Sequence, residues 1–100
     1  MIRRLPRGIV RAVSGIVEGV GAEPYRTIVS ESAEVIGAGI ASERVRRRLI
    51  VAVQLNVANH REWPFERLQR RYELPCSLSY FKKQKYKYIM EVADRCGFIG

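Results

Sequence analysis

The sequence contains few metal-binding or redox-active residues and no long apolar run. Its 100 residues include two cysteines, one histidine and one tryptophan. The longest uninterrupted apolar run, residues 49–53, is far shorter than the ~18 residues of a membrane-spanning helix. An apolar stretch over residues 8–20 is superficially similar to a signal peptide, but Arg11 and Glu18 interrupt it. We therefore interpret that stretch as an amphipathic helix and expect no membrane segment.

The two cysteines favour a reduced, cytoplasmic protein. If one helix holds both Cys76 and Cys96, they lie ~30 Å apart at ~1.5 Å per residue, too far for a disulfide. Cys76 precedes a basic helix, which could lower the pKa of its thiol, or it is a small half-buried residue.

Catalytic and metal chemistry are not indicated. His60 lies near a predicted helix end, where a surface histidine is the ordinary interpretation. One histidine and two distant cysteines show no zinc-ligand spacing. We expect no enzyme activity, no metal and no cofactor.

Positive charge is in excess and is concentrated in the second half of the chain. Lysine and arginine number 18 against 10 aspartates and glutamates, a net charge of +8. Residues 1–41 hold five basic and four acidic side chains (net +1), and residues 42–100 hold thirteen and six (net +7). Such an excess favours a polyanionic partner, with nucleic acid the first candidate and an anionic membrane surface the second.

Helical spacing of apolar residues dominates the first 41 residues. A helix is predicted from about Pro6 to Val17, and a second from about Tyr25 to Ile36, for which a pair of short strands is the alternative. The apolar stripe of the first helix consists of Leu5, Ile9, Val13, Ile16 and Val20. This segment could pack onto the rest of the chain, form a dimer, or lie on an anionic membrane.

Three further helices are predicted in residues 42–100. Ser42 is a suitable N-cap for a helix that ends between Ala58 and Glu62. Pro64 begins a short helix, a turn over residues 73–76 follows, and Ser77 can cap a long helix to about Cys96. The expected buried stripe of the long helix is Leu78, Phe81, Tyr88, Ile89, Val92 and Cys96, with Lys85 as the one misfit, and Phe98 and Ile99 are expected to fold back onto the core. The fold class is thus a single all-α domain of four or five helices.

The last three helices have the layout of a helix-turn-helix, in which the final helix can enter the DNA major groove. From Arg67 to Met90 there are seven basic residues and one acid, Glu73. Lysines can neutralise phosphates, serines at the helix start can bond them, and Lys83 is placed to reach a guanine. The candidate DNA-binding residues are Arg67, Arg70, Arg71, Ser77, Ser79, Tyr80, Lys82, Lys83, Tyr86 and Lys87.

Four segments within residues 74–99 carry a family resemblance. They are Leu74-Pro75-Cys76-Ser77, the basic and aromatic run from Tyr80 to Tyr88, Ala93, and Gly97-Phe98-Ile99. Together they resemble the C-terminal helix-turn-helix of bacteriophage transcriptional regulators of the ArpU and RinA type. That family is similar to the DNA-binding region 4 of sigma factors. The resemblance covers about a third of the chain and implies a small activator of late phage genes, with the helix after Ser77 as recognition helix.

The sequence therefore supports a principal hypothesis and two alternatives. The principal one is a phage or mobile-element transcriptional regulator that binds double-stranded DNA, with RNA polymerase or another host protein, and a second copy of the chain, as further partners. The first alternative is a small phage-encoded protein that binds and inhibits a host protein or ribonucleoprotein, since fold does not fix function. The second is RNA binding without sequence preference.

Overall fold

The computed structural model describes residues 5–19 and 21–99, and over these the chain is all-helical, as predicted. The elements are α1 (Arg7–Glu18), α2 (Tyr25–Ser32), the 3-10 turn η1 (Ala33–Val35), α3 (Glu43–Ala58), α4 (Phe65–Tyr72) and α5 (Leu78–Arg95). The alternative of two strands in the second segment is wrong, because α2 and η1 occupy it. Val20, predicted for the first apolar stripe, lies outside the described residues.

Serine caps begin the two longest helices, as predicted. The Ser42 hydroxyl oxygen accepts a hydrogen bond from the backbone N–H of Val45 at 3.3 Å, and Ser77 accepts one from Tyr80 at 3.2 Å. Each bond satisfies a backbone donor that has no partner inside its helix. After α5, Gly97 adopts a left-handed φ of 78°, the conformation that commonly ends a helix.

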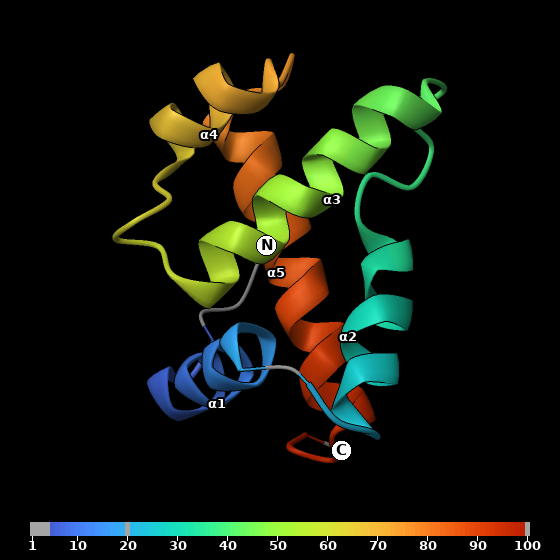
Figure 1. Ribbon diagram of the computed structural model, residues 1–100, viewed down its shortest axis with the longest axis vertical. Coiled ribbons are helices and arrows are strands. Elements are labelled where there is room, and N and C mark those ends of the chain that lie inside the picture. Colours follow the sequence, from blue (N-terminus) through green and yellow to red (C-terminus); the bar gives the residue numbers. More distant parts are fainter. Residues whose placement is uncertain (1–4, 20, 100) are drawn as a thin grey trace.

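The helices surround α5, which runs through the middle of the molecule (Figure 1). α1 packs on α3 and α5, α2 lies beside the C-terminal half of α5, and α4 packs on α3. One cluster of buried residues joins these elements, with Val13 and Ile36 from the N-terminal segment and Leu49, Phe81 and Val92 from the rest. The N-terminal segment therefore contributes directly to the same core as residues 42–100.

Tyr88 of α5 connects three helices. Its ring is fully buried, its hydroxyl donates to the Val29 carbonyl of α2 at 3.2 Å, and it accepts from Gln54 Nε2 of α3 at 3.2 Å. Burial raises the pKa of Tyr88, so the hydroxyl stays protonated and able to donate.

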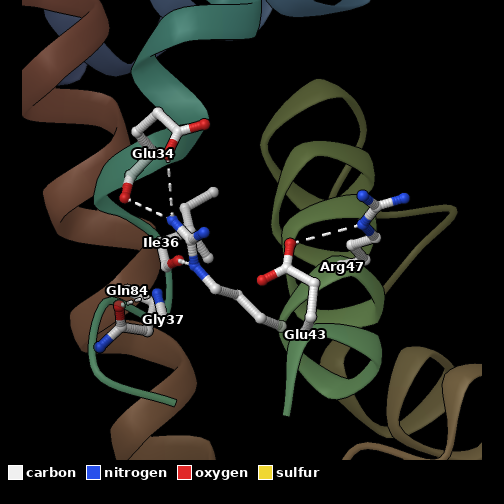
Figure 2. A network of polar contacts seen from close by, with 7 residues as sticks. Glu34, Ile36, Gly37, Glu43, Arg47 and Gln84 are labelled. Carbon is white, nitrogen blue, oxygen red and sulfur yellow. Dashed lines mark hydrogen bonds and ion pairs between the residues drawn. The ribbon is translucent and has the colours of Figure 1, made fainter. Parts of the chain in front are cut away.

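A polar network fixes the chain between η1 and α3 (Figure 2). Arg46 of α3 donates from Nε to the Ile36 carbonyl at 3.0 Å and from Nη2 to the Glu34 carbonyl at 2.7 Å. One residue further on, the Gly37 N–H donates to Gln84 Oε1 of α5 at 2.8 Å. Backbone groups of this connection are thus satisfied by side chains of two different helices.

Four expectations about the last helix are corrected. Leu78, predicted for the buried stripe, is 41% exposed, because the first turn of α5 lies at the end of the core. Phe98 is 42% exposed, whereas Ile99, just beyond it, packs against the core. Cys76 precedes the Ser77 cap and Cys96 follows the last residue of α5, so no helix holds both cysteines, and both thiols are free. Cys96, predicted for the buried stripe, is only half-buried.

Candidate nucleic-acid interface

The connection between α4 and α5 is held by local hydrogen bonds. Glu73 adopts the left-handed conformation (φ 51°, ψ 50°), and the next N–H, of Leu74, donates to the Gln69 carbonyl at 3.1 Å. Leu74 itself is buried, as is usual for the hydrophobic residue of such a helix end. Gln69 Nε2 also donates to the Cys76 carbonyl at 3.2 Å. The five residues 73–77 thus form a defined turn.

Aromatic packing holds the two helices of this unit together. The Phe65 ring of α4 and the Phe81 ring of α5 lie with their centroids 5.0 Å apart at an interplanar angle of 53°. Tilted contacts of this kind are favourable beyond the apolar area that they bury. They fix the start of α4 against the end of the first turn of α5.

The first half of α5 carries unbalanced positive charge. Residues 78–87 contain four lysines and no acid, whereas residues 88–95 contain two acids and one arginine. Lys82, Lys83 and Lys87 are exposed, and none forms an ion pair with another described residue. Lys83 and Lys87 share one side of the helix because they are four residues apart, and Lys82 flanks that side.

The polar and aromatic candidates on α5 divide into two groups. Ser77 and Ser79 are exposed at the start of the helix. Tyr80 and Tyr86 are half-buried. Tyr80 borders an apolar pocket of about 360 Å³ beside the turn, and Tyr86 borders an open hollow of about 460 Å³ near Val35. Both tyrosines therefore pack partly against the protein, and the serines and lysines form the more accessible surface.

The arginines of α4 are all exposed, but they differ in their contacts with neighbouring side chains and backbone groups. Arg67 Nη1 lies 2.9 Å from Glu62 Oε1 and donates to the Glu62 carbonyl at 2.7 Å, and its guanidinium lies 4.3 Å from the Trp63 ring centroid. Arg70 donates to the backbone of its own helix, and Arg71 lies 5.9 Å from the Tyr72 ring. Arg67 is thus partly neutralised, and Arg70 and Arg71 retain their charge for a partner.

The single acid between Arg67 and Met90 pairs with an arginine of the preceding helix, α3. A Glu73 carboxylate oxygen lies 3.5 Å from Arg48 Nη1 of α3. Sequence spacing could not indicate this pair, because the two residues are 25 positions apart and meet only in the folded chain. The ion pair offsets the charge of Glu73 at the turn.

The described part of the chain also bears on metal binding, on the Cys76 thiol and on membrane spanning. No group of three or more His, Cys, Asp or Glu side chains there is arranged to hold a metal ion. Burial raises the pKa of the Cys76 thiol, so the predicted lowering by the basic helix is wrong and the half-buried interpretation is confirmed. Among the residues described, no helix combines the length and apolarity needed to cross a membrane.

Comparisons with known proteins return no relative. The chain matches no family model, no curated protein and no solved structure.

Proposed function

We propose that the chain binds double-stranded DNA as a phage or mobile-element transcriptional regulator, with α5 as the recognition helix and α4 beside the phosphate backbone. The observation that carries the proposal is the exposed, unpaired set of Lys82, Lys83 and Lys87 on the first half of α5. Recognition helices read bases with their N-terminal residues, and phosphates attract unpaired lysines.

The arrangement around these lysines supports the same role. Ser77 and Ser79 lie at the N-terminal end of α5, where hydroxyls, backbone N–H groups and the helix dipole favour phosphate. Arg70 and Arg71 follow on α4 and can contact the flanking backbone. The helix resembles that of the ArpU and RinA regulators, which is the basis for proposing transcription as the process and RNA polymerase or a second copy as further partners.

Binding to a random pool of duplex DNA at ~50 and ~200 mM salt tests the proposal. We expect binding that weakens steeply with salt and enrichment of a common sequence. Lys83→Ala should relax the preference at one position of the enriched site, by about 1–3 kcal/mol of discrimination. Lys82→Ala should instead weaken all sequences alike and lower the salt slope by about 1.

Arg26→Gln serves as the control, because it removes one exposed charge from α2. It should leave the selected sequence unchanged. Failure to bind duplex DNA at low salt would refute the proposal. Salt-sensitive binding of duplex DNA and RNA without enrichment would point to RNA or nonspecific polyanion binding. Binding to a host protein that depends on the aromatic side chains and not on Lys83 would favour the inhibitor alternative.

A further inference from the structure

A second concentration of basic groups lies away from the turn, in a pocket between α1, α3 and α5. The pocket has a volume of about 300 Å³. Its lining residues are Val10, Arg11, Ser14 and Gly15 of α1, Asn56 and Val57 of α3, His60 after α3, and Lys85 and Ile89 of α5. The volume is at the lower end of the range for small-molecule sites.

The lining is positive and contains no acid. Arg11, His60 and Lys85 come from three separate segments, and neither Arg11 nor Lys85 forms an ion pair within residues 5–19 and 21–99. Burial, and then the charge of Lys82, lower the pKa of Lys85. A half-buried ammonium without a counter-charge is unfavourable, and a bound anion would relieve that cost.

Two neutral polar side chains, Ser14 and Asn56, complete the polar part of the pocket. Ser14 Oγ donates to the Ala58 carbonyl at 3.2 Å, which fixes α1 against the end of α3. Asn56 Nδ2 donates to the Trp63 carbonyl at 2.8 Å, and an amide nitrogen carries a second hydrogen. These bonds hold the polar wall in place before any ligand arrives.

The remaining wall is apolar or open. Val10, Val57 and Ile89 supply aliphatic surface. Gly15 supplies none, and a Cβ at Gly15 would meet no atom within 4 Å. The pocket therefore has room beside its basic groups for a small organic substituent.

We propose that this pocket binds a phosphate group, free or carried by a small organic molecule, between Arg11, His60 and Lys85. Three basic groups on separate elements suit an anion with three or four oxygens better than a carboxylate with two. The site is independent of the DNA-binding proposal, because it uses none of the residues assigned to DNA.

NMR titration of the full chain with inorganic phosphate and with phenyl phosphate, at constant ionic strength in sodium chloride, tests the site. We expect saturable shifts of the Ser14, Gly15 and Asn56 amides. Lys85→Met should weaken binding at least tenfold, whereas Lys83→Met, the same charge change on the exposed side of α5, should leave it within twofold. Tighter binding of phenyl phosphate would identify an organic phosphate as the ligand, and equal binding would identify free phosphate.

Arg11→Gln gives a second, independent variant in case Lys85→Met perturbs the fold. Because Arg11 is exposed, its replacement should leave the amide spectrum of the folded chain unchanged. The same replacement should weaken phosphate binding severalfold. Equal losses in Lys83→Met and Lys85→Met would overturn the proposal, since diffuse positive charge would then explain the binding. Absence of saturable shifts in the wild-type chain would overturn it as well.

Discussion

Gln84 Oε1 in the middle of α5 accepts a hydrogen bond from the backbone N–H of Gly37 at 2.8 Å, across 47 residues of sequence. Both residues are buried, and Gln84 is only 4% exposed. The bond supplies the acceptor for a backbone donor that water cannot reach, and it joins the connection after η1 to the recognition helix of the proposed interface.

Replacement of Gln84 by Leu should destabilise the protein. The side chain keeps a similar volume, but the Gly37 N–H is left buried without an acceptor, at a cost of about 1–3 kcal/mol. Urea unfolding followed by circular dichroism measures the loss. Lys83→Leu, on an exposed neighbour, should change the free energy of unfolding by less than about 0.5 kcal/mol. Equal effects of the two substitutions would contradict the assigned role of Gln84.

Gly37→Ala should also destabilise the fold. Gly37 has a φ of +64°, and an added Cβ would lie 3.0 Å from Ile40 Cδ1 and 3.2 Å from Leu49 Cδ2. The left-handed conformation alone costs a residue with a Cβ about 1–2 kcal/mol. In Gly8→Ala, by contrast, the new methyl meets nothing within 4 Å and should stabilise α1 by about 0.5–1 kcal/mol. Thermal unfolding should show a lower midpoint temperature for Gly37→Ala and a higher one for Gly8→Ala than for the wild-type chain. A stabilised Gly37→Ala variant would contradict the left-handed conformation assigned to Gly37.

Ser32→Ala should stabilise the protein. Ser32 is fully buried in α2, and its hydroxyl has no hydrogen-bond partner among the described residues. Removing an unsatisfied buried hydroxyl recovers about 1 kcal/mol of desolvation cost. Ser30→Ala on the exposed side of the same helix gives the gain from helix propensity alone. The prediction requires that Ser32→Ala exceed Ser30→Ala in unfolding free energy, and it is refuted if they are equal.

Glu73→Gly should be more stable than Glu73→Ala. Both variants lose the exposed contact with Arg48, so the difference between them isolates the left-handed backbone at position 73. Glycine adopts that conformation without the Cβ penalty, and we expect an advantage of about 1 kcal/mol. Chemical unfolding of the Glu73→Gly and Glu73→Ala variants measures this difference in the free energy of unfolding. Equal stabilities would mean that the turn does not hold this conformation in solution.

Lys85→Met should stabilise the protein at neutral pH, and its advantage over wild type should shrink as the solution becomes alkaline. The pKa of Lys85 is lowered from its usual 10.5, chiefly by burial, so the folded state disfavours the charged form. That penalty is present in full below the folded pKa and is relieved as the pH rises from the folded pKa towards 10.5.

The shrinking difference is measured by unfolding both proteins from pH 7 to 10. The raised pKa of Tyr88 affects them equally and cancels in the comparison. Lys83→Met, which removes the same charge from the exposed side of α5, is measured beside them as the matched control. A stability difference for Lys85→Met that stays constant with pH would contradict a penalty from the buried charge.

Sequence alone determined the helices and their limits with good accuracy. Ser42 and Ser77 cap α3 and α5, as expected, and Gly97 follows α5 with a positive φ. These signals depend on contacts within about four residues, so the chain carries them locally. The excess of lysine on the first half of α5 is likewise a property of the sequence.

Only the tertiary structure decided which residues those helices bury and join. Gln84 is buried and Leu78 is exposed, although polarity alone would predict the opposite for each. Gln84 is buried because the connection after η1 brings the Gly37 N–H to it, and Leu78 is exposed because the first turn of α5 lies at the end of the core. Lys85, a misfit in an apolar stripe, lines one pocket with Arg11 and His60 because α1 and α3 pack against that part of α5. Side-chain burial depends on what distant segments place opposite a residue, and local spacing does not contain that information.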